Sequence, residues 1–386
     1  MKKRYAVLGA GRQGVAAAYD LAKFGQAQEI ILADREPSLA QNQATRLNKL
    51  LQKKLVTPTA LDVSDTSFLF NLLKPIDGVF SAVPYFLNEK ITQMAIETQT
   101  HMVDLGGNTD VVWKQHQLSS NAKAAGITII PDCGLMPGYG NLLAVYALET
   151  LDEVHSVHIR CGGLPQQPKP PLQYKLVFSI EGLTNEYFGK AHFLRNGKII
   201  EVDTFTELET LAFQPPVGTC EAFTTSGGTS TCPWSFEGKI QNYDYKTVRY
   251  PGHYEKIKTC LELGLLDTTP VTVGDCTLSP RQVFHTVVTP KINFPEDKDL
   301  VVLRATCQGI KNGESKTITL ETIDFLDDTT GFSAMERTTG FSAALVLEML
   351  VLGNYPTGVH RLETTLSGKT YLEHLQKHSI PVSIRK

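Results

Sequence analysis

Residues 5–14 read YAVLGAGRQG, an apolar run that ends in the turn Gly9-Ala10-Gly11-Arg12-Gln13-Gly14. Apolar residues then recur at helical spacing over residues 12–23, and a second apolar run, residues 29–33, ends at Asp34. The order strand, glycine turn, helix, strand is that of one βαβ unit. We therefore expect the chain to open with a parallel sheet whose first strand is residues 5–8.

Each glycine of the turn has a separate physical reason. Gly9 lets the chain leave the strand sharply, Gly11 lets a diphosphate approach the backbone, and Gly14 lets the helix pack closely on the sheet. The helix start adds free N–H groups and a partial positive charge. The motif predicts a dinucleotide site at Gly9, Gly11, Arg12, Gln13 and Gly14.

An acidic residue stands at the distance that this motif requires. Asp34 ends the second strand, about twenty residues after Gly14, where a carboxylate accepts hydrogen bonds from the adenosine ribose. A carboxylate there repels the extra phosphate of NADP and so favours NAD. The neighbouring Arg35 suits that phosphate, which leaves NADP open as the alternative cofactor.

Strand and helix patterns go on alternating as far as Pro131, which predicts a Rossmann-type, doubly wound parallel sheet over residues 1–131. Longer strand-like runs separated by Gly and Pro clusters follow, and they predict a second α+β domain for the substrate over residues 132–335. The further strands expected in the first domain are 56–61, 78–83, 102–105 and 127–130, and its helices are 12–23, 38–52, 67–73, 88–98 and 115–125.

The composition excludes several classes of protein. Hydrophobic residues make up 42% and charged residues 20%, with a formal net charge of −3, so nothing attracts the chain to nucleic acid or to an anionic membrane. We expect no membrane span and no signal peptide. The seven cysteines form no Cys-x-x-Cys pair, and no metal-binding spacing occurs, which predicts reduced thiols, no metal and a cytoplasmic protein.

Ligands of doubly wound sheets bind beyond the carboxyl ends of the strands. Ala82 and Val83 follow one expected strand, and Asp104 and Gly106 follow the next. We expect all four at the cofactor, with Asp104 contacting the nicotinamide end or the substrate amine. A cap of the turn beside two glycines is an equally valid interpretation of Asp104.

Two polar stretches mark the second domain. Residues 224–231 are rich in hydroxyls, so Thr225 and Ser226 either bind a substrate carboxylate or satisfy their own loop. Residues 245–253 include Arg249, which suits bidentate capture of a carboxylate, and His253, which suits proton transfer near neutral pH. The alternatives are an ordinary solvated arginine and an ordinary half-buried histidine.

Several long motifs in one order resemble the saccharopine dehydrogenase-like family, and within it the bacterial lysine 6-dehydrogenases. They run from the glycine turn almost to the C-terminus. The motifs are VDLGG (103–107), IIPDCGLMPG (129–138), GGLP with the proline-rich loop that follows it (162–171), FSIEGL (178–183), EAFTTSGGTST (221–231), YKTVRYPGH (245–253), EKIK (255–258) and MERTTG (335–340).

The resemblance implies a Rossmann domain, a second domain carrying the substrate, and a C-terminal segment, residues 336–386, that returns to the first domain. It implies oxidation of the ε-amine of L-lysine by NAD, giving an imine that is hydrolysed to a semialdehyde, which cyclises. It also implies a homo-oligomer. A small-molecule amine is then the only ligand expected besides the cofactor.

Motif position and chemistry together suggest roles within that activity. His253 and Lys246 are the candidates for proton transfer, with Asp104. Arg249, beside Tyr250, is the candidate for the α-carboxylate of lysine. The α-amine needs an acceptor, for which Glu181 or Asp104 would serve.

Two other functions remain open at this point. One is a saccharopine or carboxynorspermidine type of dehydrogenase, which acts on a larger secondary amine with NAD or NADP. The other is a non-catalytic protein that binds NAD(H) and senses redox state. The cationic and aromatic residues of 245–253 favour an enzyme over a sensor.

Overall fold

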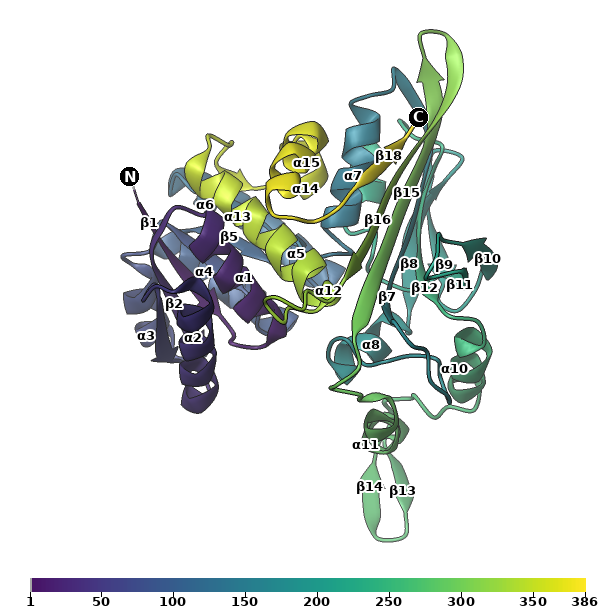
Figure 1. The fold of residues 1–386 in the computed structure, drawn as a ribbon, viewed down its shortest axis with the longest axis horizontal. Coiled ribbons are helices and arrows are strands. Elements are labelled where there is room, and N and C mark those ends of the chain that lie inside the picture. Colours follow the sequence, from purple (N-terminus) through teal and green to yellow (C-terminus); the bar gives the residue numbers. More distant parts are fainter. Residues whose placement is uncertain (1) are drawn as a thin grey trace.

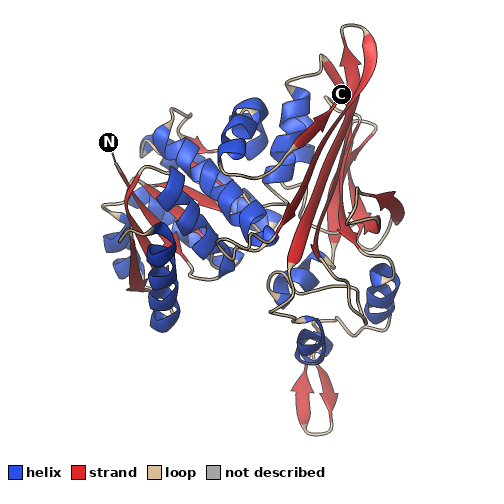
Figure 2. Ribbon diagram, viewed as in Figure 1, coloured by secondary structure: helices blue, strands red, loops and turns tan. Residues whose placement is uncertain are grey.

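The computed structural model describes residues 2–386 and consists of two large sheets, with helices around and between them, and a separate two-stranded hairpin (Figures 1 and 2). The N-terminal part carries a sheet covered by helices on both faces. The second part is dominated by long strands. Helices from the C-terminal quarter of the chain lie between the two parts (Figure 1).

The first sheet has seven parallel strands in the order β17-β6-β5-β4-β1-β2-β3, which confirms the predicted doubly wound fold. Tyr5 and Val7 of β1 enter one apolar core and Ala6 and Leu8 enter another, so both faces of this strand are buried. Its strands are β1 (Lys3–Leu8), β2 (Ala27–Asp34), β3 (Val56–Ala60), β4 (Gly78–Ser81), β5 (His101–Asp104), β6 (Thr128–Ile130) and β17 (Gly358–Val359).

The helices of this domain follow the predicted order, with one difference. The helix expected over residues 115–125 is two helices. The side chain of Asn108 accepts a hydrogen bond from the N–H of Val111 and starts a helix earlier, and that helix ends at Gln117. The helices are α1 (Arg12–Phe24), α2 (Pro37–Leu51), α3 (Thr66–Leu73), α4 (Asn88–Glu97), α5 (Thr109–Gln117) and α6 (Ser119–Ala124), with a short turn, η1 (Tyr85–Leu87).

The second sheet has nine strands in the order β10-β11-β12-β7-β15-β16-β18, with β8 and β9 attached beside β12. Only the pair β12 and β7 is parallel, which confirms the predicted mixed second domain. Its strands are β7 (Glu153–Pro165), β8 (Lys190–Arg195), β9 (Lys198–Asp203), β10 (Glu209–Ala212), β11 (Thr219–Phe223), β12 (Asn242–Arg249), β15 (Asp299–Lys311), β16 (Glu314–Phe325) and β18 (Ser383–Arg385).

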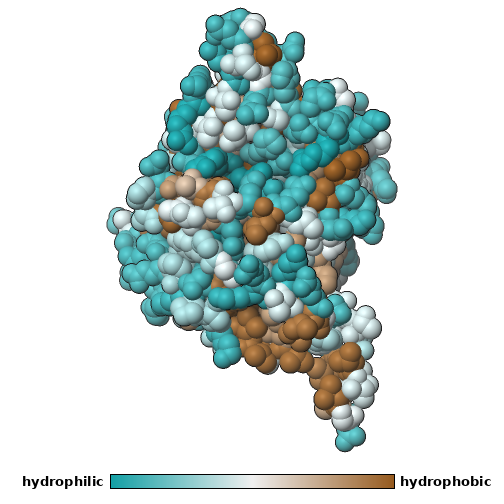
Figure 3. Space-filling model, turned by 90° about the vertical axis from the view of Figure 1, so that its right-hand side faces the viewer, coloured by the Kyte–Doolittle hydropathy of each residue, from teal (hydrophilic) through white to brown (hydrophobic). Residues whose placement is uncertain are grey.

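Five helices accompany this sheet, and one arm projects from it. The arm is a separate hairpin, β13 (Val271–Val273) and β14 (Cys276–Leu278), and apolar residues gather on it and on the surface beside it (Figure 3). The helices are α7 (Tyr139–Leu148), α8 (Ile180–Glu186), α9 (Cys232–Phe236), α10 (His253–Glu262) and α11 (Pro280–Ile292). None of the helices that the structure describes has the length and apolar character of a membrane-crossing segment.

The C-terminal segment contacts both domains. α13 (Ser342–Leu352) packs on α1 and β5, and β17 pairs with β6 of the first sheet. The chain then crosses to the second domain, where α15 (Gly368–Lys377) packs on α7 and β18 pairs with β16. The two shorter helices of this segment are α12 (Ala334–Glu336) and α14 (Leu362–Thr365), and a π-helical turn, η2 (Arg337–Phe341), precedes α13. The segment therefore does not end on the first domain, and it ties the two sheets together.

Candidate active site

The glycine turn has the geometry that a dinucleotide requires. Gly9 adopts a φ of +101°, and a Cβ at Gly14 would overlap the carbonyl oxygen of Gly9, so the turn and the close helix contact both need glycine. A Cβ at Gly11 would meet no atom within 4 Å, which leaves open space where a diphosphate would lie. The first turn of α1 has no acidic side chain to oppose an anion.

Ala82 and Val83 lie against this turn from the end of β4. A Cβ on Gly9 would stand 2.8 Å from the carbonyl oxygen of Ala82 and 3.5 Å from Val83 Cγ1. Arg12, also in the turn, donates from Nη1 to the carbonyl oxygen of Val177 in the second domain, at 3.3 Å. Contacts of these three residues with the cofactor stay predictions.

Asp34 is fixed at the end of β2 by two backbone donors. Its Oδ2 accepts from the N–H of Ala10 at 2.7 Å, and its Oδ1 accepts from the N–H of Glu36 at 2.9 Å. The carboxylate is half-buried and is hydrogen-bonded to the glycine turn through Ala10. This position suits the binding of a ribose beside the turn. Arg35 beside it is exposed.

Replacing Asp34 by Ala should weaken NAD binding and reduce discrimination against NADP. Two charge-assisted hydrogen bonds to the ribose are lost, and so is the repulsion of the extra phosphate, so we expect the dissociation constant for NAD to rise about tenfold or more. Calorimetric titrations of both cofactors measure this change. An unaltered preference between NAD and NADP would exclude the ribose role.

A cleft between the domains adjoins the turn. Its main pocket has a volume of about 190 Å³, and a second pocket of about 140 Å³ shares Leu105, Met136 and Glu186 with it. The main pocket is lined by Gln13, Leu105, Gly134, Leu135, Met136, Cys161, Gly162, Gly163, Phe178, Glu186, Tyr245, Thr247, Arg249, Met335 and Thr339. Because Gln13 belongs to the glycine turn, the expected cofactor site and the pocket are continuous.

Arg249 is the one cationic side chain among the residues that line either pocket. It is 2% exposed, and its Nη1 donates to the carbonyl oxygen of Val248 at 2.9 Å. Its guanidinium lies 4.8 Å from the ring centroid of Tyr174. A buried guanidinium with an edge toward a pocket is suited to binding a carboxylate.

Glu186, at the end of α8, lines both pockets, and the sequence analysis did not single it out. Burial raises the pKa of its carboxyl group to about 7, and the nearby charge of Arg249 opposes that rise. A carboxyl group that titrates near neutral pH inside a pocket is suited to proton transfer. No sequence motif marked it, because its place depends on how α8 packs.

Asp132 is a second carboxyl group with a raised pKa in the cleft. Burial and the neighbouring Asp104 raise its pKa to about 7, and its Oδ2 accepts a hydrogen bond from Ser230 of the second domain. Its backbone adopts a φ of +60°, and it lines the second pocket. The bond to Ser230 joins the carboxyl end of β6 to the polar loop 224–231.

Two family models together match most of the chain. Residues 5–130 match the saccharopine dehydrogenase NADP binding domain, and residues 134–380 match the saccharopine dehydrogenase C-terminal domain. The chain belongs to the saccharopine dehydrogenase family. Its first domain is therefore the nicotinamide dinucleotide domain of that family.

Individual relatives of this family agree with that assignment. The mitochondrial alpha-aminoadipic semialdehyde synthase of Mus musculus is 25% identical over 91% of this chain and 44% of its own length. The saccharopine dehydrogenase [NADP(+), L-glutamate-forming] of Pyricularia oryzae is 30% identical over 54% of this chain and 48% of its own length. The chain thus spans less than half the length of these two relatives.

A solved structure has the same fold. The apo form of the saccharopine dehydrogenase (L-Glu forming) of Saccharomyces cerevisiae superposes with a TM-score of 0.78 at 21% identity, covering 99% of both chains. The two-domain arrangement described above is therefore that of a saccharopine dehydrogenase fold.

In this family member, side chains along β12 alternate between the two faces of the sheet, and only those on one face reach the pocket. Tyr245, Thr247 and Arg249 line the pocket from one face of the strand. Tyr250 packs instead in an apolar cluster on the other face of the sheet. The predicted contact of Tyr250 with the substrate is therefore wrong, because the strand turns its side chain away.

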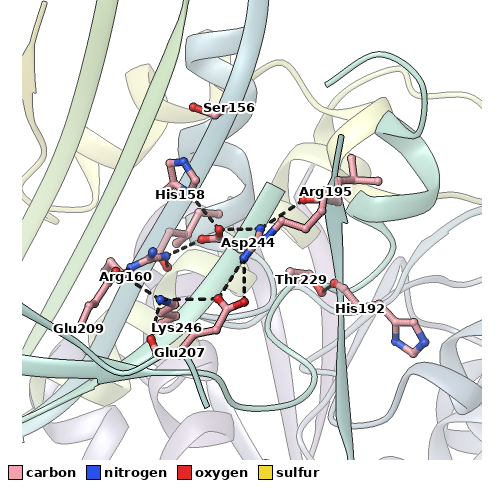
Figure 4. Close-up of polar contacts among 12 residues, drawn as sticks. Ser156, His158, Arg160, His192, Arg195, Glu207, Glu209, Thr229, Asp244 and Lys246 are labelled. Carbon is pink, nitrogen blue, oxygen red and sulfur yellow. Dashed lines mark hydrogen bonds and ion pairs between the residues drawn. The ribbon is translucent and has the colours of Figure 1, made fainter. Parts of the chain in front are cut away.

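Lys246 also points away from the pocket, so its predicted role in proton transfer is wrong. Its Nζ donates to the carbonyl oxygen of Glu207 at 2.7 Å and to Glu209 Oε2 at 3.2 Å (Figure 4). Arg160 on the neighbouring strand pairs with Glu209 and with Asp244, so Lys246 belongs to an ion-pair cluster on the opposite face of the sheet (Figure 4).

Replacing Lys246 by Met should therefore affect stability and leave catalysis nearly unchanged. The ammonium is 8% exposed on its side chain and its two carboxylate partners are over a third exposed, so we expect a loss of about 1–2 kcal/mol in the free energy of unfolding. Urea denaturation and steady-state kinetics measure the two effects. A large loss of kcat in a folded variant would return Lys246 to the active site.

Asp104 is fully buried and touches neither pocket. Its Oδ1 accepts from the N–H groups of Gly106 and Asp132 at 2.8 and 3.1 Å, and its Oδ2 accepts from Gln115 Nε2 at 2.7 Å. Burial raises its pKa. The predicted contact with nicotinamide or amine is wrong, and the alternative role as a cap of the turn describes it. Gly106 belongs to this turn, packed against Asp132.

His253 is fully buried and does not line the pocket. Burial and the charge of Arg249 lower its pKa to about 3, so the ring is neutral at working pH. A proton-transfer role for His253 is wrong, because it has no access to a substrate. Instead, it lies on the side of Arg249 that faces away from the pocket.

The remaining predicted substrate residues lie at the margins of the cleft. Glu181 is 75% exposed on its side chain and faces His285, so it does not serve the α-amine of a bound substrate. Thr225 is buried, and its hydroxyl bonds that of Thr247 at 2.7 Å, which places it behind the pocket wall. Ser226 lines the second pocket. Among residues 2–386, no cluster of three or more His, Cys, Asp or Glu side chains is placed to hold a metal.

Proposed function

We propose that the chain oxidises the ε-amine of L-lysine with NAD. The observation that carries the proposal is that a buried arginine, Arg249, and a carboxyl group that titrates near pH 7, Glu186, line one pocket beside the cofactor turn. An arginine supplies the site for an α-carboxylate, and the carboxyl group supplies a proton acceptor. Both requirements arise from oxidising an amino acid at its side-chain amine.

The charge of the pocket favours lysine over saccharopine. Saccharopine has three carboxylates, whereas Arg249 is the one cationic side chain among the residues lining the two pockets. Burying a carboxylate without a partner is costly, so each further carboxylate would need another donor. A substrate with a single carboxylate matches the pocket best.

The chemistry follows from these two residues. Arg249 binds the α-carboxylate and orients the side chain. The carboxylate of Glu186 accepts a proton from the ε-ammonium, so that the nitrogen lone pair assists departure of a hydride from the ε-carbon. Bound NAD supplies the hydride acceptor. The resulting iminium adds water and releases ammonium, which gives the semialdehyde, while the proton on Glu186 leaves to solvent.

A saccharopine or carboxynorspermidine type of dehydrogenase is the second candidate. The names of the relatives favour it, and so does the second pocket, whose volume of about 140 Å³ gives room for a longer amine. A redox sensor without catalysis has less support, because it needs no buried arginine in a pocket beside the cofactor. Asp34 supports NAD over NADP in both candidates.

Steady-state assays separate the candidates. With L-lysine and NAD we expect NADH and ammonia to form in equal amounts. A saccharopine-type enzyme instead forms reduced cofactor with saccharopine, and a sensor binds NADH without turnover. No NADH from L-lysine at any pH between about 7 and 11, a range that extends past the pKa of the ε-amine at about 10.4, would exclude the proposal. A cytoplasmic location and a homo-oligomer stay predictions, and light scattering after size exclusion measures the latter.

A further inference from the structure

A chain of hydrogen bonds runs from the pocket arginine into the core of the second domain. Arg249 Nε lies 3.4 Å from the hydroxyl of Tyr187, and that hydroxyl lies 2.9 Å from His253 Nε2. The other ring nitrogen, Nδ1, lies 3.1 Å from the carbonyl oxygen of Leu172. Four groups from separate segments are thus connected in one line behind the pocket wall.

The chemistry of its two ends fixes the direction of every bond in this chain. The carbonyl of Leu172 has no hydrogen to give, so Nδ1 of His253 carries the proton and donates. The ring is neutral, so Nε2 is bare and accepts from the hydroxyl of Tyr187. The guanidinium at the far end has only donors, so the oxygen of Tyr187 accepts from Arg249. Only this assignment of donors and acceptors gives every group in the chain a hydrogen-bond partner.

The surroundings hold this chain rigidly. Tyr187 is 1% exposed and His253 is fully buried. The ring of His253 makes an edge contact with that of Tyr174 at 5.4 Å between centroids, and Tyr174 also lies under the guanidinium of Arg249. Nε and Nη1 of Arg249 are bonded to Tyr187 and Val248, and Nη2 has no hydrogen bond to any residue in the described range 2–386. Nη2 is therefore the guanidinium nitrogen whose N–H groups are both left to donate to a ligand.

We propose that His253 is a positioning residue that acts through Tyr187 to fix the guanidinium of Arg249, and that this chain makes the enzyme specific for amines that carry a carboxylate. The inference rests on the proposed function for its substrate. Its physical basis is separate, because a pre-oriented guanidinium loses less conformational freedom when it binds a carboxylate. His253 itself transfers no proton.

Two variants break the chain at different bonds. Tyr187→Phe removes the central hydroxyl and retains the ring. His253→Asn retains a donor near Leu172 but is too short to accept from Tyr187, whereas His253→Gln places an amide oxygen near the position of Nε2. Tyr254→Phe is the matched control, since it removes a buried hydroxyl that donates to the carbonyl oxygen of Phe205 at 2.6 Å within the same aromatic cluster.

The decisive readout compares ligands with and without a carboxylate. We expect Tyr187→Phe and His253→Asn to lower the ratio of kcat/KM for L-lysine to that for pentane-1,5-diamine about five- to tenfold, the factor that corresponds to the loss of one hydrogen bond of ordinary strength. His253→Gln should recover most of that ratio, and Tyr254→Phe should retain all of it. Equal losses with both substrates would overturn the inference, because they indicate general damage to the fold.

A binding experiment without turnover tests this inference separately from the proposed reaction. L-Norleucine has the carboxylate of lysine but no ε-amine, so calorimetry with the NAD-bound enzyme reports on Arg249 without turnover. We expect its dissociation constant to rise about five- to tenfold in Tyr187→Phe and not in Tyr254→Phe. If L-lysine is not oxidised but this pattern holds, the reaction is wrong and the positioning chain stands. If L-norleucine does not bind the unsubstituted protein, or binds Tyr187→Phe equally well, the chain has no such role.

Discussion

Replacing Glu186 by Gln lowers kcat with L-lysine by about 10²- to 10⁴-fold, the range that general base catalysis contributes. The amide retains the volume and polarity of the side chain but cannot accept the proton of the ε-ammonium. Cofactor binding should not change, because Glu186 lies at the end of α8 on the second domain. Steady-state kinetics and calorimetry with NAD measure the two quantities.

The pH dependence of the same variant gives an independent test. The carboxylate is the active form of Glu186 and the pKa of this group is about 7, so kcat/KM should fall with decreasing pH below about 7. Glu186→Gln should lack that limb, and its residual activity should rise at alkaline pH, where the substrate amine is already neutral and needs no base.

Glu181→Gln is the control on the same helix. Its carboxylate is 75% exposed and lies outside the pockets, so kcat and the pH profile should match those of the unsubstituted enzyme within about twofold. If Glu181→Gln and Glu186→Gln lose activity alike, or if neither does, Glu186 is not the base.

Replacing Arg249 by Ala raises KM for L-lysine by about 10²-fold or more and raises KM for NAD little. A buried, charge-assisted contact with a carboxylate is worth about 3 kcal/mol when one partner is removed, which corresponds to this factor. Removing the charge also raises the pKa of Glu186, because Arg249 lowers it in the folded protein. The acid limb of kcat/KM should therefore move to higher pH.

Arg249→Lys separates charge from geometry. It keeps a cation in the pocket but loses the planar group that bonds Tyr187 and Val248, so we expect a KM between those of the unsubstituted enzyme and Arg249→Ala. Circular dichroism and thermal melting establish that both variants fold. Equal increases in KM for NAD and for L-lysine would remove Arg249 from the substrate site.

The first domain could be predicted from sequence because local patterns determine it. The turn from Gly9 to Gly14 needs glycine for reasons that act within a few residues, and Asp34 stands at a distance set by one helix and one strand. The alternation of strand-like apolar runs with helical patterns then predicts the parallel sheet. The split between α5 and α6 does not follow from apolar spacing, because the cap at Asn108 is a weaker sequence signal.

The second domain's site was predicted less well because sequence proximity is a poor guide within a strand. Lys246 and Arg249 are three residues apart on β12, so their side chains lie on opposite faces of the sheet. Applying the two-residue period of a strand to residues 245–250 would have separated them. The same period places Tyr250 on the face of Lys246, away from the pocket.

Burial is the property that sequence did not reveal. Asp104 follows a strand as a cofactor ligand would, but its oxygens are taken up by Gly106, Asp132 and Gln115 inside the fold. Glu186 has no motif, and its raised pKa comes from its burial in the folded chain. The burial of His253 is also not readable from the sequence, because its partners Tyr187 and Leu172 are more than sixty residues away.

Transfer of deuterium tests the central claim most directly. L-Lysine dideuterated at the ε-carbon is incubated with the enzyme and NAD, and the reduced cofactor is analysed by mass spectrometry. We expect one deuterium in each NADH, with ammonium released in equal amount, because the hydride leaves the ε-carbon while Arg249 holds the carboxylate. Reduced cofactor without deuterium, or formed with saccharopine but not with lysine, would contradict the account.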